Sequence, residues 1–141
     1  ILVVILVPTI FFGYRELSSD YNNLRIKDLM GEARSQAQEY SKNQTPPSYT
    51  ASTMLSPAPS CTGDMFFGNF PHNLSGITGT PSSWPKGTTL SCQATALQFA
   101  ISASLSPGDG PGEVANVWCV DSTGRSMWLK NHLVVGDTNC N

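Results

Sequence analysis

The first 42 residues carry the pattern of a long helix. From Leu24 onward, apolar residues recur at steps of three and four positions with charged residues between them, as in an amphipathic helix. The apolar residues that follow Leu24 in this pattern are Ile26, Met30, Ala33, Ala37 and Tyr40. Because no proline lies between Pro8 and Pro46, the pattern predicts one helix over residues 1–42, about 60 Å long.

The N-terminal end of this helix, residues 1–12, is apolar apart from Pro8 and Thr9. A bilayer core of ~30 Å needs about 20 apolar residues in a helix, so this stretch alone is too short to cross it. A helix of this length extends past a small globular part, and its apolar extension must be covered by lipid or by other protein chains. Pro8 lacks a backbone donor and crowds the preceding turn, which predicts that the helix kinks or unwinds on its N-terminal side.

The last third of the chain has the period of strands. Alternate positions from Thr95 hold Leu97, Phe99, Ile101, Ala103 and Leu105, which predicts a half-buried strand. A second strand is predicted from about Val114 to Asp121. A third is predicted through Met127, Leu129, Leu133 and Val135, with turns at residues 107–112 and 122–124.

Short connections between these strands imply an antiparallel sheet, whose apolar face the amphipathic part of the helix must cover. The predicted fold class is therefore α+β, with a long N-terminal helix packed against a C-terminal antiparallel sheet. Residues 1–42 form the helix and residues 43–141 a globular head. Within the head, residues 43–90 are rich in Ser, Thr, Pro and Gly and are expected to be an irregular, variable loop, followed by the strands in residues 91–141.

Charge argues against a nucleic-acid partner. The chain has 8 basic and 10 acidic residues, for a formal net charge of -2, and five of the basic residues alternate with acids in the helix. This distribution provides no basic face for a run of phosphates. Only 13% of the residues are charged, against ~25% in an average domain, so the surface is expected to be small, polar and turn-rich.

The four cysteines predict two disulfide bonds and an oxidising compartment, because an even count in a short chain with an apolar N-terminal segment is typical of exported domains. They contain no C-x-x-C pair, so a zinc site is not expected. Four cysteines allow three connectivities. We favour Cys119 with Cys140, tying the chain's last residues to the middle strand, and Cys61 with Cys92, closing the irregular loop; four free thiols are the alternative.

Taken together, these features resemble the type IV pilin and pilin-like proteins. The resemblance rests on Ile-Leu-Val-Val-Ile-Leu-Val-Pro at residues 1–8, Phe-Phe-Gly-Tyr-Arg at 11–15, the long helix, and Trp-Cys-Val-Asp-Ser-Thr-Gly at 118–124. It covers both ends of the chain but not residues 43–90. On this match, about fourteen residues of the family's mature chain would precede Ile1, including its peptidase site and N-terminal glutamate.

The resemblance implies a structural subunit of a type IV pilus that polymerises through its N-terminal helix and serves adhesion, motility or DNA uptake. It implies an extracellular filament, with anchoring in the inner membrane before assembly. The implied partners are copies of the chain and the pilus assembly machinery. The alternatives are a pseudopilin of a type II secretion system and a monomeric, membrane-anchored extracytoplasmic binding domain. The implied filament core is Ile1, Leu2, Val3, Val4, Ile5, Leu6, Val7, Pro8, Ile10, Phe11 and Phe12.

Candidate chemistry is weak, and neither an enzyme nor a cofactor is expected. The glycines of residues 108–112 are followed by neither a helix nor a lysine, so they predict a turn and not a phosphate cradle. His72 or His132 could form a hydrolase site with a serine only if the fold brought the two side chains together, which their spacing does not predict. No Gly-x-Ser-x-Gly elbow is present in the sequence. The candidate calcium ligands are the carboxylates of Asp109, Glu113, Asp121 and Asp137, but their spacing fits no calcium loop.

Overall fold

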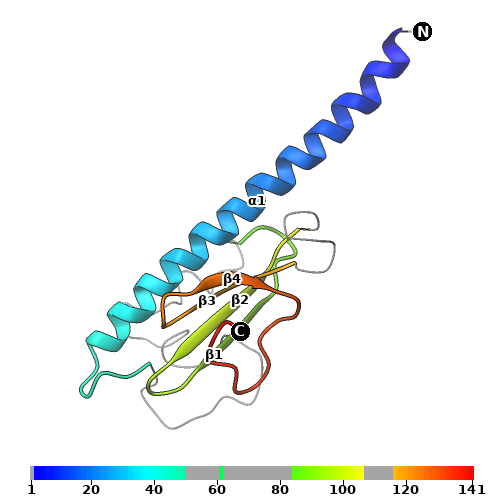
Figure 1. The fold of residues 1–141 in the computed structure, drawn as a ribbon. Coiled ribbons are helices and arrows are strands. Elements are labelled where there is room, and N and C mark those ends of the chain that lie inside the picture. The colour runs from blue at the N-terminus through cyan, green and yellow to red at the C-terminus, as the bar shows by residue number, and fades with distance from the viewer. Residues whose placement is uncertain (1, 50–60, 62–83, 107–115) are drawn as a thin grey trace.

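The computed structural model describes residues 2–49, 61, 84–106 and 116–141, with side chains from Ser19 on. Its elements are α1 (Leu2–Lys42), β1 (Leu90–Ala94), β2 (Phe99–Ser104), β3 (Val117–Asp121) and β4 (Ser126–Leu129). The strands form one antiparallel sheet in the order β1-β2-β3-β4. The predicted α+β class is therefore confirmed. Helix α1 packs along the sheet, and its N-terminal half extends beyond the head (Figure 1).

Helix α1 is continuous across Pro8, so the helix does not unwind there, and Figure 1 shows no sharp bend at its N-terminal end. Within the described part of the chain, no helix has an apolar stretch long enough to cross a membrane. Of the residues expected in the filament core, Ile1 lies outside the described residues and the rest belong to the free end of α1. Much of the expected variable loop, residues 50–60 and 62–83, also lies outside them, as does the turn at residues 107–112.

The C-terminal half of α1 forms the core with one face of the sheet. All five apolar positions of the predicted stripe are buried, with exposed fractions of at most 2%: Ile26, Met30, Ala33, Ala37 and Tyr40. They pack in one cluster with sheet residues that include Phe99, Ile101 and Val120. Burying a large apolar side chain stabilises a fold by about 1.5–3 kcal/mol, so this stripe is the main attachment of the helix to the head.

The start of the stripe was predicted one position too late. Leu24 is 62% exposed and points away from the sheet, whereas Asn23 is 1% exposed and continues the spacing of the buried positions. The amide of Asn23 forms two hydrogen bonds with the backbone of Ser106: Oδ1 accepts from the Ser106 N–H (2.8 Å), and Nδ2 donates to its carbonyl (3.4 Å). A polar residue thus fastens α1 to the chain just after β2.

The sheet contains a strand that the sequence pattern missed, and β2 begins later than predicted. β1 pairs with β2 from Leu90↔Ala103 to Ala94↔Phe99. The intervening residues form a hairpin loop in which the Thr95 N–H donates to the Gln98 carbonyl (2.7 Å). Leu97, expected on the buried face of a strand, is instead 82% exposed in this loop. The described part of the second predicted strand begins at Val117, because residues 107–115 lie outside the described residues.

The third predicted strand ends at Leu129 and does not include Leu133 or Val135. The turn at residues 122–124 before it is confirmed. Four residues, 122–125, connect β3 to β4, and among them Gly124 has φ +92°, a left-handed conformation that suits glycine. After β4, residues 130–141 turn back across the second face of the sheet. We call residues 130–141 the C-terminal strap.

Candidate functional site: the C-terminal strap and the surfaces beside it

The C-terminal strap covers the face of the sheet that α1 leaves open. This face carries small and polar side chains, in a row across the strands formed by Ser91, Ser102 and Cys119. All three are buried, as are Leu133 and Cys140 of the strap. We expected β2 to be half-buried with one solvated side, and this was wrong, because the strap lies over that side. Small side chains on the sheet allow the strap to approach the strands closely.

Two disulfide bonds hold the head. They join Cys61 to Cys92 and Cys119 to Cys140, the two pairings that the sequence analysis favours. The first joins the loop region to β1. The second joins the end of the strap to β3, and both of its cysteines are wholly buried. On the chain-entropy account, a crosslink over 21 residues stabilises a fold by ~3 kcal/mol.

Asp121, at the end of β3, connects the β3–β4 turn to the strap. It is wholly buried. Its Oδ1 accepts hydrogen bonds from the Thr123 hydroxyl (2.6 Å), the Thr123 N–H (2.9 Å) and the Arg125 N–H (3.1 Å). Its Oδ2 accepts from the Cys140 N–H (2.9 Å). Burial alone would raise the pKa of this carboxyl, but the hydrogen bonds from Thr123, Cys140 and Arg125 outweigh burial and the pKa is lowered.

Arg125 holds the same end of the strap from outside. Its guanidinium donates to the Cys140 carbonyl (3.3 Å) and to the Asn141 side-chain oxygen (3.1 Å). The Asp-Ser-Thr-Gly run that carried part of the family resemblance therefore has a structural explanation. Asp121 and Thr123 shape the turn, Gly124 permits its left-handed residue, and the carboxylate fixes Cys140 beside its disulfide partner.

The middle of the strap is held by two buried serines. Ser91 Oγ donates to the Leu133 carbonyl (2.9 Å), and the Leu133 N–H donates to Ser102 Oγ (3.2 Å). Ser102 Oγ also lies 3.1 Å from His132 Nδ1. Burial lowers the pKa of His132, so the imidazole favours its neutral form here. Serine side chains of the sheet thus satisfy the backbone N–H and C=O groups of Leu133, which do not pair with a neighbouring strand.

The Ser102–His132 contact brings together a serine and a histidine, the pair that a hydrolase site would require and that sequence spacing could not predict. Its geometry indicates a structural pair. Ser102 is wholly buried and is occupied by the strap backbone, so no substrate carbonyl can reach its oxygen. In the described part of the chain, no carboxylate is hydrogen-bonded to His132 to orient it as a base. His72 lies outside the described residues.

The carboxylates considered for calcium are not brought together. Asp109 and Glu113 lie outside the described residues. Asp121 is engaged by N–H and O–H donors, and Asp137 Oδ2 accepts from the Val134 N–H (3.0 Å) in a turn of the strap. Among the described side chains, no three His, Cys, Asp or Glu residues are close enough to hold a metal ion.

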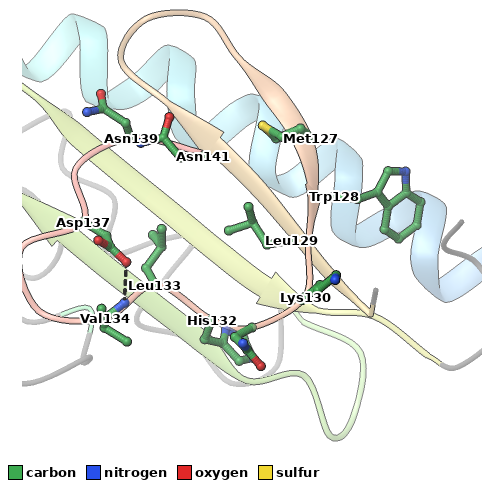
Figure 2. A pocket seen from close by; sticks show the side chains of 11 residues that line it. Met127, Trp128, Leu129, Lys130, His132, Leu133, Val134, Asp137, Asn139 and Asn141 are labelled. Carbon is green, nitrogen blue, oxygen red and sulfur yellow. Dashed lines mark hydrogen bonds between the residues drawn. The ribbon is translucent and has the colours of Figure 1, made fainter. Parts of the chain in front are cut away.

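A hollow of about 560 Å³ lies between β4 and the strap (Figure 2). Met127, Leu129 and Leu133 form its apolar part, and Lys130 and Asp137 are among its polar lining. The Trp128 ring lies away from the centre of the hollow (Figure 2). It contacts the Trp118 ring edge-to-face, with 5.2 Å between the ring centroids. Trp128 therefore does not offer the hollow an exposed platform of the kind that stacks on sugars or bases.

On the other face of the sheet, those tryptophans help to fix α1. Lys27 Nζ lies over both rings, 4.5 Å from the Trp128 centroid and 5.1 Å from that of Trp118. Two helical turns further along α1, Arg34 donates to the Gly124 carbonyl (3.0 Å) and to Ser126 Oγ (2.9 Å). Two cations of the helix thus contact β4 and its turn, which fixes the rotation of α1 about its axis. The opposite face of the helix is consequently held outward.

Comparisons with protein-family models, curated proteins and solved structures found nothing that matches this chain. The arguments for function therefore come from its own residues and geometry.

Proposed function

We propose that this protein is the structural subunit of a type IV pilus, which polymerises through the N-terminal half of α1. The observation that carries the proposal is the position of the apolar segment. Residues 2–12 belong to a helix whose N-terminal half extends beyond the head (Figure 1), and an apolar surface in that position needs lipid or other chains to cover it.

The physical account is a transfer of apolar surface from one environment to another. Before assembly, lipid would cover the segment; after assembly, the helices of neighbouring subunits would. Burial at ~25 cal/mol per Å² would hold such a filament together without covalent links between subunits. A head closed by two disulfides suits a subunit exposed outside the cell, where thiols are oxidised.

Two aspartate substitutions in α1 test this division of the helix. Ile5→Asp places a charge where subunits would pack, and an unpaired buried charge costs several kcal/mol, so we expect filaments to disappear while the head stays folded. Ala33→Asp places the same charge at a position that is 0% exposed between helix and sheet, so we expect the head to unfold or its melting temperature to fall sharply.

The measurements are filament counts by electron microscopy of the full chain and thermal melting followed by circular dichroism. Normal filaments from Ile5→Asp would contradict a filament core at the N-terminus. An unmodified chain that stays monomeric without detergent would instead favour the membrane-anchored binding domain.

A further inference from the structure

Helix α1 carries a second apolar stripe, on the face opposite the sheet. Its positions alternate in steps of four and three residues, and a helix places such positions along one side. A repeat averaging 3.5 residues over three heptads is the pattern by which two helices pair along their length. The positions are Val3, Val7, Ile10, Tyr14, Leu17, Tyr21 and Leu24.

The described end of this outer stripe is exposed in the subunit. Tyr21 is 67% exposed and Leu24 is 62% exposed, whereas Ile26 is 2% exposed against the sheet. At ~100° per residue, Leu24 and Ile26 point about 160° apart, so the head cannot cover both. The stripe ends at the exposed Asp28, which takes the next position of the repeat. It therefore extends about twice as far as the apolar segment of residues 1–12.

Opposite charges flank the last heptad of the outer stripe. Asp20 precedes Tyr21 and Arg25 follows Leu24; both are exposed, and within the described part of the chain neither forms an ion pair. When two helices pair in parallel and in register, the residue before one core position faces the residue five positions further on in the partner. Asp20 of one copy then lies opposite Arg25 of the other, and symmetry makes this contact twice.

We propose that α1 pairs in parallel and in register with α1 of a second copy through the outer stripe. The two heads then lie on opposite sides of the helix pair, because each sheet sits against the far face of its own helix, and they do not obstruct the contact. An antiparallel pair through the same stripe would instead set residues 3–10 against residues 17–24 of the partner, and Asp20 of one copy would lie far from Arg25 of the other. This pair goes beyond the proposed filament, since it requires only two copies.

Cross-linking of the full chain in mild detergent tests the pair. The four native cysteines are engaged in disulfides, so a single introduced thiol reports its own neighbourhood to a short bismaleimide. We expect Leu24→Cys to give at least about fivefold more cross-linked dimer than Leu97→Cys, an equally apolar control that is 82% exposed on the head. Equal yields at the two positions would overturn the proposal.

A charge exchange supplies the second readout. Arg25→Asp in the Leu24→Cys background should lower the yield of dimer about two- to fivefold, and adding Asp20→Arg should restore it, because the pair is re-formed with its signs reversed. Failure of the double exchange to restore the yield contradicts the parallel, in-register arrangement. If filaments form but Leu24→Cys gives no cross-link, the proposed filament is supported and the helix pair is excluded. If the cross-link forms but filaments do not, the helix pair is supported and the proposed filament is contradicted.

Discussion

The substitution Asp121→Asn isolates the connection between the β3–β4 turn and the C-terminal strap. The side chain keeps its shape, but one of its two acceptor oxygens becomes an NH₂ donor. Three of the four donors converge on Oδ1, so the amide oxygen will stay with Thr123 and Arg125. The NH₂ group then faces the Cys140 N–H, 2.9 Å away in the native protein, and two donors are left opposed in a buried site.

The expected loss of stability follows from those contacts. A hydrogen bond to a charged group contributes about 1.5–3 kcal/mol, and an unsatisfied buried donor costs ~1–3 kcal/mol. These terms describe largely the same lost contact, so we expect Asp121→Asn to lower the free energy of unfolding by about 2–3 kcal/mol at pH 7. The matched control is Asp137→Asn, which weakens one exposed hydrogen bond to Val134 and should change stability by less than ~1 kcal/mol.

Acid gives the same substitution a distinctive signature. Because the folded-state pKa of Asp121 is lowered, its carboxylate contributes stability that is present above the ordinary pKa of an aspartate and is lost as pH falls through the lowered value. Urea denaturation of both chains from pH 7 downward should therefore show their stabilities converging in acid. A difference that stays constant over that range, or no difference at pH 7, would refute the assignment of Asp121 as the strap's anchor.

Two further outcomes are expected from the strap. Replacing both Cys119 and Cys140 with Ser should lower the free energy of unfolding by about 3 kcal/mol in urea denaturation, and an unchanged midpoint would show that the strap is held without its disulfide. Because burial lowers the pKa of His132, native stability should fall as pH drops below ~6.5 towards that lowered value, since the unfolded chain takes up the proton first. His132→Gln should flatten this part of the stability–pH curve, and an unaltered slope would assign it to another group.

Helical spacing predicted the contact between helix and sheet well, because both partners follow simple periods. The five apolar positions from Ile26 to Tyr40 are all buried as expected. The error at Leu24 arose because a search for apolar residues passes over Asn23. Its position fits the spacing of the buried residues, but its side chain is polar. Its burial depends on the backbone of Ser106, 83 residues away in the chain, a partner that no local pattern reveals.

Strand periods failed where tertiary contacts replaced them. Leu97 fits the alternation of β2, yet Thr95 closes a hairpin without Gly or Pro, so no turn residue marked the boundary. Leu133 has the parity of Met127 and Leu129 but lies in the strap, where Ser91 and Ser102 bind its backbone. β1 was missed although Leu-Ser-Cys-Gln-Ala alternates apolar and polar residues, because it is only five residues long and directly precedes the run assigned to the next strand. Its polar side chains, Ser91 and Gln93, are buried as well.

The strap also bears on why the outer face of α1 is available to partners. A sheet with one open apolar face normally needs a second layer of helices or strands. Here the second face carries serines and small side chains on β1 and β2, with Met127 and Leu129 on β4, and the irregular strap covers it, fixed at its end by Cys140 and Asp121. In the part of the chain that the structure describes, one helix and the strap cover the two faces of the sheet, and the helix uses only one of its own faces to do so. The opposite face, with Tyr21 and Leu24 exposed, is left for contacts outside the subunit. Loss of the strap should therefore damage the head first and assembly second, whereas substitutions on the outer stripe should affect association alone.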